Sequence, residues 1–144
     1  MRRLLLAFFV LLPWIANAQP TQFRDPQGRA TARAETRGNT TTYYDLTARI
    51  TGRSERRGTT IRHFDAQGQA TGRSEVHGAA TTSYDAQNRV TGRVEVRGGD
   101  ATRYDAQGRV IGRIENRGGV ARYRDAVGRD QGGAQGPAAP TGPR

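Results

Sequence analysis

Acidic residues recur every ten residues along nearly the whole chain, with Asp and Glu alternating, so the full repeat is twenty residues long. One phase carries Asp, at Asp25, Asp45, Asp65, Asp85, Asp105 and Asp125. The other phase carries Glu, at Glu35, Glu55, Glu75, Glu95 and Glu115. An internal repeat of this length indicates a chain built from one supersecondary unit that is used several times.

Each acid opens a segment that is typical of a tight turn. The Asp segments follow Asp-x-Gln-Gly, as in Asp105 to Gly108, and the Glu segments follow Glu-x-Arg-Gly, as in Glu115 to Gly118. Glycine tolerates positive φ, so it can close a type I turn with a following bulge. Asn88 and Ala48 each replace this glycine once, and we expect the turn at Ala48 to be strained or looser. Turns every ten residues leave strands of about seven residues, which predicts consecutive β-hairpins.

A three-residue loop at every turn would leave each strand flush with both neighbours. In this register Tyr104 pairs with Val110, Arg103 with Ile111, and Ile114 with Val120. Side chains alternate between the two faces of a strand, so one face is charged and the other mildly apolar. We expect the apolar face to carry one aromatic ring in each of four repeats, opposite a small apolar residue and diagonal to a glycine that it covers. These rings belong to Tyr44, Phe64, Tyr84 and Tyr104.

The predicted fold class is therefore all-β: an extended antiparallel meander of 20-residue hairpin repeats that forms a single twisted sheet. Such a sheet has a half-apolar face that needs cover and two free edges. We expect self-association through that face or those edges. A β-solenoid is the alternative, although it would stack like charges above one another.

The first eighteen residues are typical of a secretory signal peptide. Arg2 and Arg3 precede an apolar run, and Ala16 to Ala18 matches a small-x-small cleavage site. The run is shorter than the about 20 residues that span a bilayer, and an uncleaved anchor is the alternative. We expect cleavage after Ala18, a secreted or periplasmic protein, and no membrane span after cleavage. Residues 19–129 are the predicted repeat domain, with five repeats and a partial sixth, and residues 130–144 a flexible tail rich in Gly, Pro and Ala.

One block of the repeat carries a family resemblance. The pattern Tyr-Asp-x-x-Gly-Arg, complete at 104–109 and partial at 64–69, resembles the YD repeat of Rhs-type and teneurin-type proteins, over about residues 23–130. The resemblance implies β-hairpins that wind into a long sheet and a bacterial surface or secretion context. Arg24 and Arg124 depart from the pattern, because they replace the aromatic residue in the first and last copies.

The basic residues are all Arg, 23 in number, and the formal net charge is +10. Guanidinium groups suit phosphate, sulfate and carboxylate, so the excess favours binding of polyanions such as lipopolysaccharide, acidic polysaccharide or extracellular DNA. A solvated, partly neutralised face is the alternative. One candidate set forms a row across the charged face, at Arg33, Arg53, Arg73, Arg93 and Arg113. A second set lies at the Glu turns, at Arg37, Arg57, Arg97 and Arg117.

No residue pattern predicts catalysis, a metal site or a cofactor. The chain has no Cys, which excludes disulfides and Cys-ligated metals. His63 and His77 occupy different repeat positions and are interpreted as variation at exposed sites. The ladder carboxylates recur in every copy, whereas an active site would break the repeat, so a cell-wall polysaccharide hydrolase is the least favoured function. The predicted function is a non-enzymatic binding or assembly module at the bacterial cell envelope or outside the cell, with polyanion binding as the second choice.

Overall fold

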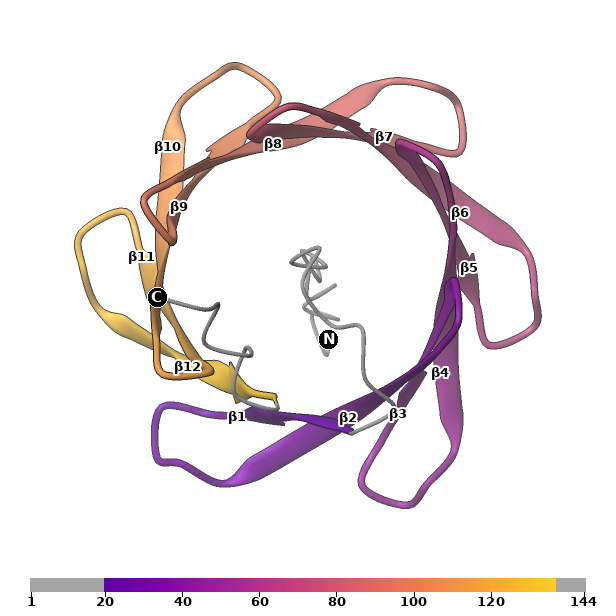
Figure 1. The fold of residues 1–144 in the computed structure, drawn as a ribbon, viewed down its shortest axis with the longest axis horizontal. Coiled ribbons are helices and arrows are strands. Elements are labelled where there is room, and N and C mark those ends of the chain that lie inside the picture. The colour runs from indigo at the N-terminus through magenta and orange to yellow at the C-terminus, as the bar shows by residue number, and fades with distance from the viewer. Residues whose placement is uncertain (1–19, 137–144) are drawn as a thin grey trace, which may run out of the picture.

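A computed structural model describes residues 20–136 as twelve antiparallel β-strands that close into a barrel (Figure 1). The strands follow chain order around the ring, and β1 pairs with β12 to close it. They are β1 (Thr21–Arg24), β2 (Ala30–Arg37), β3 (Thr40–Tyr44), β4 (Ile50–Arg57), β5 (Thr60–Asp65), β6 (Ala70–His77), β7 (Ala80–Asp85), β8 (Val90–Arg97), β9 (Asp100–Asp105), β10 (Val110–Arg117), β11 (Val120–Asp125) and β12 (Asp130–Gln135). Between residues 20 and 136 no helix has the length and apolar character that a bilayer crossing needs.

The predicted open sheet is wrong, because the first and last strands are paired with each other. Gln22 faces Gln135, and Phe23 faces Ala134. Strand β12 lies in the segment predicted to be a flexible tail, so the sixth repeat extends beyond residue 129 and supplies the strand that completes the ring. Closure leaves no free sheet edge in the described part of the chain, which removes the predicted route to strand pairing. The solenoid alternative is also excluded, since each strand pairs with its antiparallel neighbours in sequence. The predicted signal peptide, residues 1–18, lies outside the described residues.

The three-residue loop predicted for the Asp turns is confirmed. The Asp105 amide donates to the Arg109 carbonyl over 2.9 Å, and the Gly108 amide donates to the Asp105 carbonyl over 3.1 Å. Gly108 has a φ of +79°, as a type I turn with a following bulge requires. Ala48 takes the same left-handed conformation with a φ of +62°, which costs a residue with a Cβ about 1–2 kcal/mol.

The Glu turns are shorter than predicted. Arg117 pairs with Val120, which leaves a two-residue loop whose first residue, Gly118, has a φ of +58°. Positive φ at this position is typical of the two-residue hairpin turns that match the twist of a sheet. Ile114 consequently faces Tyr123 and not Val120.

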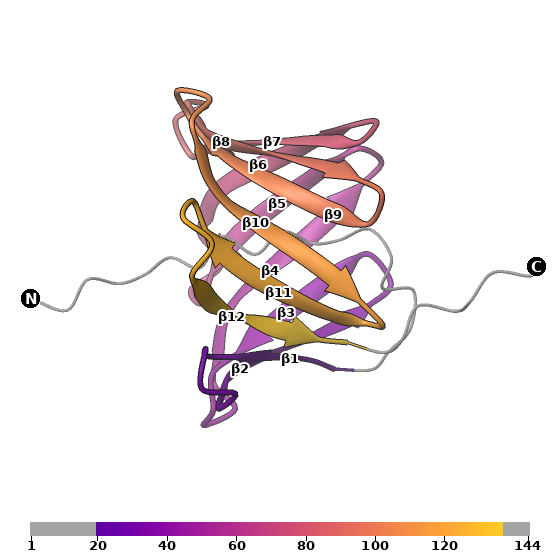
Figure 2. The same ribbon diagram turned by 90° about the vertical axis from the view of Figure 1, so that its left-hand side faces the viewer.

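A bulge after each Asp turn adds to this change of register. Tyr104 faces Val110, as predicted, but Arg103 faces Gly112, so one residue of β10 has no partner on β9. Ser54 faces His63, and His63 in turn faces Gly72. These two steps cross one repeat but advance the sequence by 18 residues, although the repeat is 20 residues long. The strands are thus staggered by two residues per repeat, and stagger of this kind tilts strands and allows a sheet to close. The tilt is visible in the side view (Figure 2).

The inner wall carries small and apolar residues, and the outer wall carries most of the charge. Val94, Ala101, Ile114 and Ala121 are buried together on one side of the inner wall. Val96, Tyr123 and Ala134 pack against this cluster. Twelve strands about 4.8 Å apart and tilted by about 40° give a backbone radius of about 12 Å. The search for a binding site therefore turns to the side chains on the outer wall.

Candidate anion-binding surface

Four members of the predicted arginine row lie on the outer wall, each above an aromatic ring. The guanidinium carbon lies 4.7 Å from the ring centroid for Arg33 over Tyr44, 4.5 Å for Arg53 over Phe64, 4.3 Å for Arg73 over Tyr84 and 4.9 Å for Arg93 over Tyr104. The prediction that these rings cover glycines on the apolar face is wrong. The bulge and the short Glu turn shift the register, so each ring shares the outer face with the charged residues.

The same four arginines each bind the Glu two residues further along the strand. Arg73 Nε lies 2.9 Å from Glu75 Oε1, and Arg53 Nε lies 3.0 Å from Glu55 Oε1. The hydrogen bond from Arg73 lowers the pKa of the Glu75 carboxyl. Each guanidinium is thus held by a ring and a carboxylate together. Most of its charge is neutralised within its own repeat, so these four positions have little to offer a ligand.

The ladder Asp residues stabilise their own turns. Asp105 Oδ1 accepts the amides of Gln107 and Arg109, each over 2.9 Å, and Arg109 Nε donates to Asp105 Oδ2 over 2.6 Å. The backbone hydrogen bond from Arg109 is the main reason that the pKa of Asp105 is lowered. The carboxylates therefore cap turns and hold Arg side chains.

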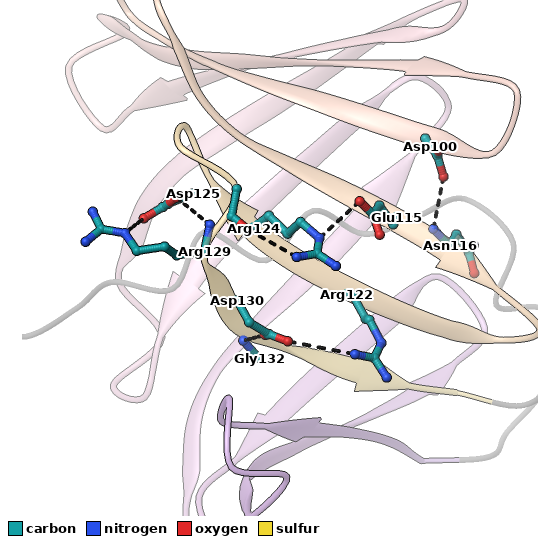
Figure 3. A network of polar contacts seen from close by, with 10 residues as sticks. Asp100, Glu115, Asn116, Arg122, Arg124, Asp125, Arg129, Asp130 and Gly132 are labelled. Atoms are coloured by element: carbon teal, nitrogen blue, oxygen red, sulfur yellow. Dashed lines mark hydrogen bonds and ion pairs between the residues drawn. The ribbon is translucent and has the colours of Figure 1, made fainter.

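The arrangement of ring, arginine and carboxylate breaks down at β10 and β11. Arg113 faces Arg124, which stands where the other repeats place a ring. Arg124 Nε binds Glu115 Oε1 over 3.0 Å, and Arg124 Nη1 donates to the Gly128 carbonyl over 3.1 Å. Figure 3 shows Arg124 reaching Glu115 on the outer wall. Among residues 20–136 Arg113 has no carboxylate within ion-pair distance, because the Glu that its counterparts bind is bound here by Arg124.

The second predicted arginine set lies at one end of the barrel, spread around its rim. Its members end strands β2, β4, β8 and β10 at the Glu turns, as Arg37, Arg57, Arg97 and Arg117. All four are exposed. Arg37 makes a long ion pair of 3.9 Å with Glu35. Arg117 shares the outer face of β10 with Arg113, which extends the positive surface.

Three arginines of this region were missed by the sequence analysis: Arg24, Arg122 and Arg124. Arg24 and Arg124 were seen only as departures from the repeat. The sequence signal for these two residues is that both departures introduce Arg. Once the barrel closes, their strands β1 and β11 lie on either side of β12. We call Arg24, Arg113, Arg117, Arg122 and Arg124 the arginine surface.

The inner wall holds a chain of hydrogen-bonded polar side chains. Ser54 Oγ lies 2.8 Å from His63 Nδ1, and Ser74 Oγ lies 2.9 Å from His63 Nε2. Tyr43 Oη extends the chain at Ser54 over 3.4 Å, and Ser83 Oγ extends it at Ser74 over 3.0 Å. The interpretation of His63 as variation at an exposed site is wrong, because the bulge and the short Glu turn place its ring on the inner wall. This series of hydrogen-bonded side chains includes no carboxylate, so it lacks the acid of a Ser-His-Asp triad.

Burial lowers the pKa of His63 below its usual value, which predicts a pH-dependent stability. Between about pH 6.5, the usual histidine pKa, and the lower value in the folded state, the unfolded chain binds a proton that the folded barrel does not. The free energy of unfolding should therefore fall as the pH falls below about 6.5. Urea unfolding at pH 7.0 and 5.5 measures this fall. His63→Gln should reduce the fall, and His77→Gln, on the exposed outer wall, should keep it. An equal fall in both variants would contradict the assignment.

In the part of the chain that the structure describes, no three His, Cys, Asp or Glu side chains converge on a possible metal position. Comparison with known families finds no family model that matches, and no curated protein matches the chain. The resemblance to YD repeats stays a prediction.

Proposed function

We propose that this protein is a non-enzymatic binding module of the cell envelope or the extracellular space, and that it binds acidic polysaccharides. The observation that carries the proposal is the facing pair Arg113 and Arg124, of which only Arg124 has a carboxylate, Glu115, within ion-pair distance among residues 20–136. Everywhere else in the outer row, a ring takes the place of the second guanidinium. The outer wall at β10 and β11 therefore carries one guanidinium group more at this position than the equivalent strands of the other repeats.

The charges around this pair support the same conclusion. Arg117 and Arg122 are exposed on the same strands, and Arg122 lies 3.8 Å from its nearest carboxylate, that of Asp130. Uncompensated guanidinium groups bind sulfate, phosphate and carboxylate with directed hydrogen bonds. Charges gathered on one face also raise the rate at which a polyanion arrives. The predicted signal peptide favours a polysaccharide over a nucleic acid as the polymer that this surface meets.

Retention on immobilised heparin, an acidic polysaccharide, tests the proposal. We expect Arg113→Gln/Arg124→Gln to elute at lower salt than the unmodified protein. The dependence of log K on log salt should become shallower by about 1–2, as for the loss of two ionic contacts. The control is Arg57→Gln/Arg62→Gln, which removes the same charge from β4 and β5, far round the barrel. It should shift elution much less.

A second variant tests whether heparin is retained by the pair Arg113 and Arg124 or by the total positive charge. Arg124→Tyr restores the residue type found at Tyr84 and Tyr104 and should let Arg113 stack on the new ring. We expect weaker heparin retention with an unchanged unfolding midpoint. Equal shifts in both double variants would show non-specific charge binding and contradict the proposal. Stronger retention on immobilised double-stranded DNA than on heparin would contradict the choice of polysaccharide.

A further inference from the structure

A shallow cleft of about 160 Å³ lies at the place where the barrel closes. It runs over the backbone of Gly132 and Gly133 in β12, with Arg24 of β1 on one side and Arg122 of β11 on the other. The cleft is a direct consequence of the repeat. Gly133 stands where all the other even-numbered strands, β2 to β10, place the row arginine, such as Arg53 or Arg93. The outer wall therefore has a missing side chain at this point.

The register places two arginines around that gap. Gly133 faces Arg24 on one neighbouring strand and Arg122 on the other. The backbones that carry the two arginines are therefore two strand spacings, or about 10 Å, apart. Because no side chain stands between them, both long side chains can turn toward one group above Gly133.

The guanidinium groups retain donors for a ligand. Arg24 Nη1 donates to the Gly28 carbonyl and Arg24 Nη2 to Gln22 Oε1, each over 2.9 Å, so both partners are neutral. The neighbouring Asp25 carboxylate is bound to Arg29 over 2.7 Å. Within residues 20–136 the polar contact of the Arg122 side chain is that of 3.8 Å with Asp130, which Figure 3 shows beside the Gly132 amide. Of the five N–H donors of a guanidinium, Arg24 uses two in these contacts.

Asp130 also lines the cleft and is its one carboxylate without a close cationic partner. Its Oδ1 atom accepts the Gly132 amide over 2.7 Å, so one oxygen is committed to the strand. Asp25, the second carboxylate of the cleft, is bound by Arg29, so three guanidinium groups face two carboxylates and the surroundings of the cleft are positive by one charge. A compact group with several acceptor oxygens suits two donors that approach from opposite sides.

We infer that this cleft binds one tetrahedral oxyanion, a phosphate or sulfate group, between Arg24 and Arg122. The inference rests on the proposed function, since it makes the cleft the place where one charged substituent of the polysaccharide is held. It adds a specificity that the rest of the arginine surface lacks. A carboxylate-only polysaccharide should bind less well than a sulfated or phosphorylated one of equal charge density.

Amide chemical shifts of the full chain test the inference with two small probes. Inorganic pyrophosphate and inorganic sulfate are titrated separately, with ionic strength held constant by sodium chloride. We expect the Gly132 and Gly133 amides to shift along saturating curves with at least one of them, and the tighter probe to identify the substituent. Shifts that rise linearly without saturation, or that are spread evenly over all exposed arginines, would overturn the inference.

Two variants test the two arginines by introducing residues that other repeats carry at the same position. Arg24→Tyr introduces the residue type of Tyr44, and Arg122→Thr introduces that of Thr82. Each should weaken probe binding about tenfold, as the loss of one charged hydrogen bond predicts. Arg62→Thr makes the same change as Arg122→Thr on β5 and should leave the affinity unchanged. Unchanged affinity in Arg122→Thr, whose exposed position tolerates substitution, would overturn the inference even if Arg24→Tyr fails to fold.

The two proposals fail separately. Heparin retention that depends on Arg113 and Arg124, together with no saturable shift at Gly133, would leave the proposed function standing and remove the cleft. Saturable binding of pyrophosphate or sulfate at Gly133, together with elution from heparin at low salt, would leave an oxyanion site and remove the polysaccharide.

Discussion

Gly92→Val is expected to lower the free energy of unfolding by about 3 kcal/mol, the upper end of the usual cost of overpacking. A Cβ on Gly92 would lie 2.6 Å from the Tyr104 carbonyl oxygen, which is a backbone atom that the β8–β9 pairing holds in place. The backbone of Gly92 is outside the left-handed region, so the whole cost arises from contact. Gly52 and Gly112 stand in the same relation to the next strand, with 2.7 and 2.4 Å to a carbonyl oxygen.

Urea unfolding followed by circular dichroism measures this effect. The control is Gly108→Asn, at a turn where a Cβ would meet nothing within 4 Å. Asn88 already adopts the required left-handed conformation at the equivalent turn, with a φ of +63°. We expect the control to stay within about 0.5 kcal/mol of the unmodified protein. A Gly92→Val protein of unchanged stability would show that β8 and β9 do not approach as closely as described.

Ending the chain after Arg129 is expected to abolish cooperative unfolding. This truncation removes β12, which pairs with β11 on one side and β1 on the other. The remaining strands cannot close the ring, so β11 and β1 would each expose a row of unpaired backbone groups. Exposed edges of this kind promote association between copies.

Sedimentation velocity and thermal unfolding measure the two consequences of the truncation. A chain that ends after Gly136 keeps all of β12 and is the matched control, which should remain cooperative and keep the oligomeric state of the full chain. If the chain that ends after Arg129 were as cooperative as this control, β12 would not be part of the closed sheet.

The sequence predicted the repeated hairpins but not their closure. The Asp turns, with Gly108 at positive φ, and the pair Tyr104 and Val110 were predicted correctly. The Glu turns were given one residue too many, and the bulge before Gly112 was not foreseen. In a strand, an error of one residue moves a side chain to the opposite face. The same error hides the stagger between strands. A flush register contains no stagger, and without stagger the strands do not tilt and the sheet is predicted to stay open.

The site shows the same limit. The sequence identified an outer row of arginines, but it placed the rings of Tyr84 and Tyr104 on the other face. Their contacts with Arg73 and Arg93 depend on strand pairing that periodicity alone leaves undetermined. The candidate site includes residues that differ from the consensus of the repeats, and a prediction based on that consensus misses them. Arg124 faces Arg113 because it replaces a ring.

A disulfide across the closing strands tests the barrel most directly, because the native chain has no Cys. Gln22 and Gln135 are opposed and exposed, and opposed residues of antiparallel strands lie about 5 Å apart, within disulfide range. In an open meander the same strands would be eleven spacings, or about 50 Å, apart. The control pair is Gln22→Cys with Thr82→Cys, on a strand far round the ring. The barrel predicts that Gln22→Cys/Gln135→Cys oxidises within one chain at micromolar concentration, seen by mass spectrometry as the loss of two hydrogens from the monomer, while the control pair stays reduced. Two free thiols in the monomer after oxidation, or cross-linking only between chains, would contradict the closed barrel.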